Sequence, residues 1–172
     1  MDTLMIILRI IHIFSGIFWV GVSFFNIGFL TPTVQATAPE SQKVMQHLTQ
    51  KTRFLTATYS AATLTLLSGL IMYWILSDFR IEYMTSGTGL VLAIGGIAGF
   101  IAWIIAIFVV RGIFGDMKAV GQAIQAQGGP PTGEQVAELQ ALSARLYRVG
   151  QWAVAILIIA VLAMSTAQYV RF

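Results

Sequence analysis

The stretch Leu8-Arg9-Ile10-Ile11-His12-Ile13-Phe14-Ser15-Gly16-Ile17-Phe18-Trp19-Val20-Gly21 decides how the chain folds. It lies near the start of an apolar run from Leu4 to Leu30, and it places Arg9 and His12 on successive turns of the expected helix. A helix needs ~20 predominantly apolar residues to cross ~30 Å of hydrocarbon, so this run predicts a membrane span. Ionisable side chains inside a span are costly and seldom face lipid. We therefore expect this face to pack against further helices.

The composition restricts the class of protein. Of the 172 residues, 57% are hydrophobic and only 10% are charged, which is typical of a single integral membrane domain over residues 1–172. The formal net charge is +3, but the ten Lys and Arg residues are spread singly and form no basic stripe, so we expect no nucleic-acid partner. The chain has no cysteine, which excludes disulfides, thiolate metal sites and iron–sulfur clusters.

Four apolar segments are long enough to cross the hydrocarbon. They are Leu4–Leu30, Phe54–Leu76, Thr88–Val110 and Leu146–Val170. None shows the alternating pattern of a transmembrane barrel, and an open strand edge finds no hydrogen-bond partner in lipid. The sequence therefore predicts an all-α fold, an antiparallel bundle of four transmembrane helices.

The basic residues predict the orientation of this bundle. Seven of the ten lie in the connections between the first and second spans and between the third and fourth spans. Basic residues near span ends favour the cytoplasmic side, so we expect both termini outside. The second connection, 112–148, predicts a cytoplasmic helical hairpin that breaks at Gly128-Gly129-Pro130-Pro131 and resumes at a cap in Thr132-Gly133-Glu134-Gln135. It is either a solvated extension of two bundle helices or a docking surface for a partner.

The first connection predicts a short exposed helix. Pro32 is expected to end the first span. Thr37-Ala38-Pro39-Glu40 has the pattern of a capping box for a new helix. This helix carries Val44, Met45 and Leu48 on one side and Lys43, His47 and Lys51 elsewhere. His47 is interpreted as an exposed helix residue rather than a ligand, because its setting is amphipathic and nearly a full bilayer separates it from His12.

The polar and small residues of the first span share one stripe. The members of this stripe follow one another at a spacing of three or four residues: Arg9, His12, Gly16, Trp19, Ser23 and Asn26. In the third span, Gly95 and Gly99 form a small-xxx-small pair beside Gly96. Such glycines serve either close packing of helices or clearance for a cofactor.

One layer of the predicted bundle collects residues suited to a cofactor. His12 lies on the order of 12 Å below the outer end of its helix, at 1.5 Å per residue. We expect Met72, Gly95, Gly96 and Met164 at a comparable depth on the neighbouring helices. A flat macrocycle needs an axial histidine, sometimes a methionine as second ligand, and free space. The layer predicts a b-type haem with His12 as ligand, Met164 or Met72 as a second ligand, Gly95 and Gly96 as clearance, Trp19 as pocket wall and Arg9 on the propionates.

A simpler interpretation of the same residues remains open. A single intramembrane histidine can hydrogen bond to a serine, a threonine or a carbonyl on the next helix, and methionines at helical spacing are ordinary packing residues. No acidic residue lies within any span, which argues against a carboxylate proton relay. The glycines 95, 96 and 99 lie in mid-span with no strand before them, so they form no nucleotide-binding motif.

The segment His12-Ile13-Phe14-Ser15-Gly16-Ile17-Phe18-Trp19-Val20-Gly21 resembles the first helix of a broad group of small bacterial membrane proteins. This group includes the HemJ-type protoporphyrinogen oxidases and the CopD-type copper-resistance proteins. The resemblance covers about the first 75 residues and implies haem- or metal-linked redox work in the bacterial inner membrane. In HemJ-type members the first-helix histidine is associated with haem b, which transfers to His12. The functional lysine of a later helix in those enzymes has no counterpart within these spans, so no subfamily is assigned.

Three functions follow from these observations, and the sequence leaves open whether the protein is an enzyme. The first is a membrane protein that binds haem b through His12 for electron transfer or an oxidase-like reaction. The second is a non-catalytic subunit or assembly factor that docks a larger complex through the hairpin at 112–148. The third is transport of copper or a small solute along the polar stripe. The expected partners are the lipid bilayer and either a second copy of the chain or a larger membrane complex.

Overall fold

The computed structural model describes residues 2–37 and 40–170, and every element in these ranges is helical. The α-helices are α1 (Asp2–Phe25), α2 (Thr31–Ala36), α3 (Glu40–Gln50), α4 (Phe54–Ser77), α5 (Ile81–Met84), α6 (Gly87–Ile104), α7 (Arg111–Ala126) and α8 (Gly133–Thr166). Two π-helical segments, η1 (Asn26–Leu30) and η2 (Ile105–Val110), and a 3₁₀ turn, η3 (Ala167–Tyr169), interrupt or extend them.

Four continuous helical stretches are long and apolar enough to cross a membrane. They are Thr3–Ala36, Phe54–Ser77, Gly87–Ala126 and Gly133–Tyr169. The predicted all-α fold with four spans is therefore confirmed. The first, third and fourth stretches are longer than the predicted spans, because α2, α7 and the first half of α8 continue the helices beyond the apolar segments.

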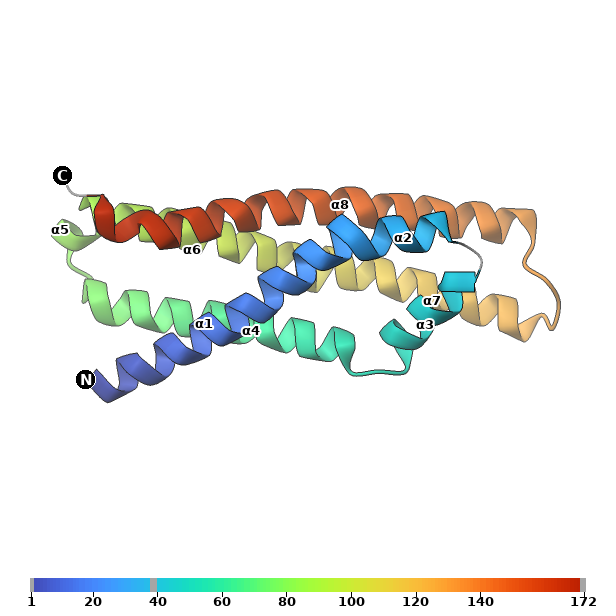
Figure 1. Ribbon diagram of the computed structural model, residues 1–172, viewed down its shortest axis with the longest axis horizontal. Coiled ribbons are helices and arrows are strands. Elements are labelled where there is room, and N and C mark those ends of the chain that lie inside the picture. The colour runs from blue at the N-terminus through green and yellow to red at the C-terminus, as the bar shows by residue number, and fades with distance from the viewer. Residues whose placement is uncertain (1, 38–39, 171–172) are drawn as a thin grey trace.

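The bundle is built from two helix pairs (Figure 1). α1 packs mainly on α4, α6 packs mainly on α8, and contacts between α4 and α6 join the pairs. In Figure 1, α1 runs diagonally across the front, away from α8 near the N-terminus and beside α8 at η1. Both termini lie at one end of the bundle, which we call the terminal end, and α2, α3 and the α7–α8 turn lie toward the other, which we call the loop end.

The first helix does not end at Pro32, which corrects the prediction made from that residue. The chain stays helical through Ala36, and η1 lies directly before the proline. The backbone N–H of Thr31 donates to the carbonyl of Asn26, five residues earlier. A proline crowds the preceding turn and offers no N–H, and a wider π turn accommodates such a break in the hydrogen-bond ladder. The helix therefore passes the proline with a local change of register.

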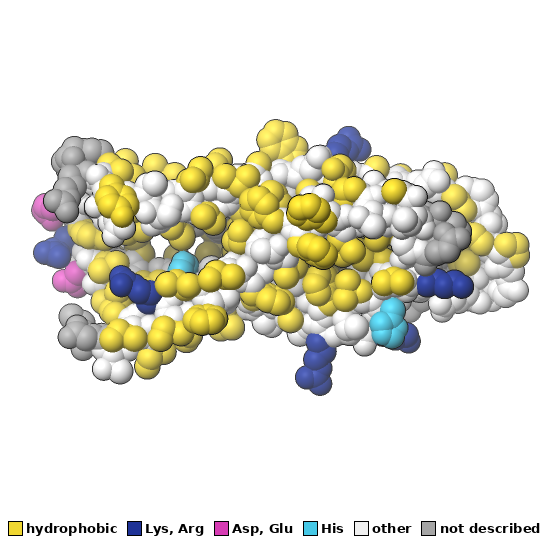
Figure 2. All heavy atoms as spheres, viewed as in Figure 1, with side chains coloured by type: hydrophobic (Ala, Val, Ile, Leu, Met, Phe, Trp, Pro, Cys, Tyr) yellow, Lys and Arg dark blue, Asp and Glu magenta, His cyan; other side chains and the backbone are white. Residues whose placement is uncertain are grey.

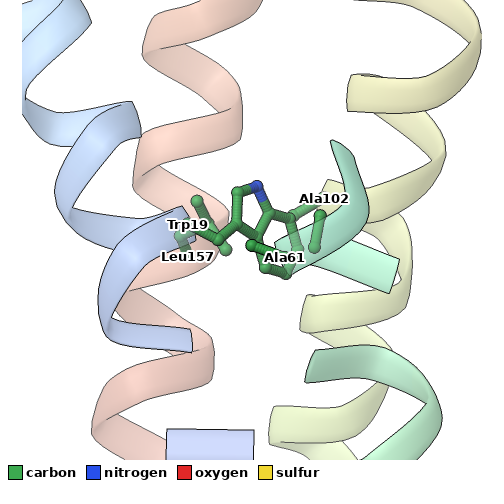
Figure 3. Packing of buried hydrophobic residues seen from close by; sticks show 5 residues of the cluster. Trp19, Ala61, Ala102 and Leu157 are labelled. Atoms are coloured by element: carbon green, nitrogen blue, oxygen red, sulfur yellow. The ribbon is translucent and has the colours of Figure 1, made fainter. Parts of the chain in front are cut away.

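The core centres on the indole of Trp19 (Figure 3). Trp19 is only 4% exposed and packs with Ala61, Ala62, Ala102 and Leu157, which come from α4, α6 and α8. The small alanine side chains leave room for one large ring where all four long helices meet. Outside this core, many large apolar side chains are exposed, as the yellow atoms in Figure 2 show, which suits contact with lipid acyl chains.

The turn between α7 and α8 has the local chemistry that the sequence predicts. Thr132 Oγ1 accepts from the backbone N–H of Gln135, and the Gln135 side chain accepts from the backbone N–H of Thr132, which completes a capping box. Gly128 has φ +65°, a conformation that favours glycine. α7 packs along α8 and buries Ile113 and Val120. The capping box predicted at Thr37–Glu40 includes residues 38–39, which lie outside the described residues.

Candidate functional site

The imidazole of His12 is tied to the backbone of α4. Its Nδ1 lies 2.8 Å from the carbonyl oxygen of Thr65. A carbonyl oxygen can only accept, so Nδ1 carries the proton in this hydrogen bond. In the neutral ring, the lone pair is then on Nε2. Nε2 has no hydrogen-bond partner among the described residues.

A glycine lets the ring lie flat against α4. A Cβ atom at Gly69 would come within 2.9 Å of His12 Cε1 and 3.1 Å of Nδ1. Real Cβ atoms essentially never come as close as 2.9 Å to another heavy atom, so an alanine here would displace the ring. Ser68 Oγ lies 3.4 Å from the same Nδ1, but it donates to the carbonyl of Leu64 at 2.6 Å. The main partner of the imidazole is therefore the Thr65 carbonyl.

The interface of α1 and α4 is polar over two turns. Thr65 Oγ1 lies 2.8 Å from Ser15 Oγ, and the Thr65 methyl group would lie 3.5 Å from a Cβ at Gly16. Hydrogen bonds between helices in a membrane contribute ~0.6 kcal/mol each. This contact holds α1 and α4 in one register, and the register brings the ring of His12 opposite Gly69.

The surface of the bundle is hollowed near the terminal end. His12 is half-buried. On the face drawn in Figure 2, the surface is hollowed between α1 and α8 toward the terminal end, and a histidine side chain is visible beside the hollow. The hollow follows from the diagonal path of α1, which separates it from α8 at this end (Figure 1).

Gly95 and Gly96 have different surroundings. A Cβ at Gly95 would lie 3.0 Å from Met164 Cγ, 3.2 Å from Ala163 Cβ and 3.3 Å from the Ala160 carbonyl oxygen, so α8 covers this position. A Cβ at Gly96 would meet nothing within 4 Å. Gly95 therefore permits close packing of α6 on α8, whereas Gly96 borders open space.

The other predicted site residues are spread around this region. Arg9 is exposed, one turn from His12 toward the terminal end. Met72 is half-buried, one turn beyond Ser68 on α4. Met164 is half-buried on α8, with its Cγ against the Gly95 position. Trp19 lies two turns from His12, packed in the core.

Two polar atoms at other positions are buried without a hydrogen-bond partner among the described residues. They are Asn26 Oδ1 and the hydroxyl of Tyr59. Asn26 is the first residue of η1, and π turns often occur at functional positions. Both residues lie on the loop-end side of Trp19 along their helices. Sequence reasoning placed Asn26 in the polar stripe but assigned it no role, although an asparagine within an apolar helix is itself a signal.

The two histidines lie on different helices, His12 on α1 and His47 on α3. Across residues 2–37 and 40–170, no group of three or more His, Cys, Asp or Glu residues is arranged to hold a metal ion. His47 is exposed on α3, near the loop end. A ligand at the His12 ring would bind through Nε2, because Nδ1 is bonded to the Thr65 carbonyl. No protein-family model matches the chain, and no curated protein or solved structure matches it either.

Proposed function

We propose that this multi-pass membrane protein binds a b-type haem through Nε2 of His12 and serves electron transfer or an oxidase-like reaction. The observation that carries the proposal is the orientation of the imidazole. Its Nδ1 is held by the Thr65 carbonyl at 2.8 Å and its Nε2 has no partner among the described residues. A metal-ligating histidine typically donates its other ring N–H to a carbonyl or carboxylate, which fixes the ring and strengthens its basicity.

The residues that the sequence assigns to the cofactor fit it in part. Gly96 borders open space, and Arg9 carries a cation one turn away that would pair with a propionate. Met72 or Met164 would supply a thioether as a further ligand to the iron. Gly95 and Trp19 already pack against other helices, so we leave both out of the cofactor contacts.

The protein's own contribution is the orientation of the ring and a medium of low dielectric constant. The Thr65 carbonyl and the surface of Gly69 hold the imidazole in one plane. The apolar side chains of the bundle lower the dielectric constant around the ring. The haem, when bound, supplies one-electron chemistry at its iron. The cation of Arg9 would balance the negative charge of a propionate in a medium where an unpaired charge is costly.

An absorption spectrum tests the proposal. The protein is purified from cells with an ample haem supply, and the reduced-minus-oxidised difference spectrum is recorded. We expect the α band of a b-type haem and close to one haem per chain in a pyridine haemochrome assay. A preparation that is folded and monodisperse but shows no haem band would refute the proposal.

We further propose that both termini face outside and that α7 and the first half of α8 project into the cytoplasm of a bacterial inner membrane. The support is the distribution of basic residues, seven of ten of which lie in the two connections at the loop end. Since the chain has no cysteine, single substitutions give a clean test. A membrane-impermeant maleimide on intact cells should label Glu82→Cys and spare Lys118→Cys. Labelling of Lys118→Cys but not of Glu82→Cys would show that the topology is opposite to the one proposed.

A further inference from the structure

α3 is an amphipathic helix that few neighbours cover. It contacts mainly α2 and the start of α4. Val44 on α3 is 68% exposed, although the residue is apolar. The helix lies near the loop end, between the last residue of α2 and the first residue of α4 (Figure 1). Both of these helices belong to stretches that can span a membrane, so α3 sits where the hydrocarbon meets water.

A shallow depression of about 380 Å³ follows one side of α3. It is lined by Lys43, Val44, His47, Leu48 and Thr52. The lining atoms are almost all apolar, although Lys43 and His47 are among the lining residues. An apolar depression beside exposed basic residues is complementary to a phospholipid, which has acyl chains next to an anionic phosphate.

Residues 40–53, which contain α3 and the turn after it, carry mainly positive charge. Residues 40–53 contain three permanent cations, Lys43, Lys51 and Arg53, and one carboxylate, Glu40. All three cations are exposed. Basic residues beside a span attract anionic lipid headgroups, and each one changes the apparent affinity about fivefold. Long basic side chains also lay their methylene groups over apolar surface while the charge stays in the headgroup layer.

We propose that α3 and the turn that follows it, residues 40–53, bind an anionic phospholipid. Lys43 contacts the phosphate, Lys51 and Arg53 add to the positive potential around it, and an acyl chain lies over Val44 and Leu48. The site anchors the loop between the first two spans to one leaflet. It lies near the opposite end of the bundle from His12, and it is independent of haem binding.

Quenching by labelled lipids tests this proposal on the full chain. Gln50 is exposed on α3 and does not line the depression, and the chain has no native cysteine, so Gln50→Cys carries a single environment-sensitive fluorophore. In detergent micelles, we expect phosphatidylglycerol with a nitroxide on its acyl chain to quench this fluorophore at least tenfold more effectively than phosphatidylcholine with the same label. Equal quenching by the two lipids would overturn the proposal.

Charge neutralisation separates this site from general attraction to a basic protein. Lys43→Gln, Lys51→Gln and Arg53→Gln together should abolish the preference for phosphatidylglycerol. The matched control, Lys118→Gln, Arg145→Gln and Arg148→Gln, removes the same charge from exposed positions of α7 and α8 and should keep it. An equal loss in both triple variants would mean that net charge and not α3 attracts the lipid, and it would refute the site. Haem content should be the same in both.

Discussion

Nδ1 of His12 on α1 lies 2.8 Å from the carbonyl oxygen of Thr65 on α4, which joins the one histidine of the transmembrane helices to a backbone acceptor. This backbone carbonyl is present whichever side chain residue 65 carries. It can accept a hydrogen bond from His12 because the hydrogen bonds within the helix leave a second lone pair on every carbonyl oxygen. The tether thus fixes the plane of the ring and leaves Nε2 as the nitrogen without a hydrogen-bond partner among the described residues.

Replacement of His12 should remove the cofactor and leave the bundle intact. His12→Ala removes Nε2, the proposed ligand to the iron. It also removes one hydrogen bond between α1 and α4, and such a bond contributes ~0.6 kcal/mol. We expect the haem band to disappear while helical circular dichroism and monodispersity are retained. His47→Ala changes an exposed residue on α3 and should keep the full haem content. A His12→Ala protein with unchanged haem would show that the ligand lies elsewhere.

Gly69→Ala should disturb the ring more than the fold. The added Cβ would come within 2.9 Å of His12 Cε1, and the imidazole is the end of a side chain that can turn away. We expect haem affinity to fall about tenfold or more, since a turned ring loses the Thr65 hydrogen bond that orients it. Gly21→Ala on α1 meets nothing within 4 Å and is the control. Equal haem affinity in the two variants would contradict the described packing of the ring.

Valine substitutions should separate the roles of Gly95 and Gly96. Gly95→Val drives side-chain atoms into Met164 and the Ala160 carbonyl on α8, and overpacking of this kind costs about 1–3 kcal/mol. Gly96→Val should leave the unfolding free energy nearly unchanged, because a Cβ there meets nothing within 4 Å. If Gly96 contributes to the proposed haem site, the same substitution should lower haem affinity. The measurements are reversible unfolding in mixed micelles and haem titration. A larger loss of stability at Gly96 would reverse these assignments.

Trp19→Ala should be the most destabilising of these substitutions. It empties the position where α1, α4, α6 and α8 meet, and large-to-small changes of a buried tryptophan cost about 3–5 kcal/mol. Trp152→Ala is the matched control, because that indole is 71% exposed and leaves no cavity within the protein. Unfolding in mixed micelles compares the two. Similar free energies of unfolding would place Trp19 outside the core.

Several features of the bundle could be predicted because they depend on local sequence. The length of an apolar run determines whether a helix can span hydrocarbon, and that property needs no knowledge of neighbouring helices. The cap at Thr132 and Gln135 is likewise local, since both partners lie within one turn. Pro32 shows where local reasoning fails: the π turn before it spreads the disruption over a longer stretch of helix.

In the candidate site, too, some features depend on local sequence and others depend on how the helices pack. The sequence by itself determined that His12 lies within a span and that a stripe of polar and small residues shares its face. Only the tertiary structure decided that the ring rests on Gly69 and bonds to Thr65, that Gly95 faces α8 while Gly96 borders open space, and that Trp19 lies in the core. The physical reason is that the helical period says which residues share a face, whereas the crossing of α1 over its neighbours determines what that face meets. A backbone carbonyl acceptor, moreover, has no signature in the amino-acid sequence.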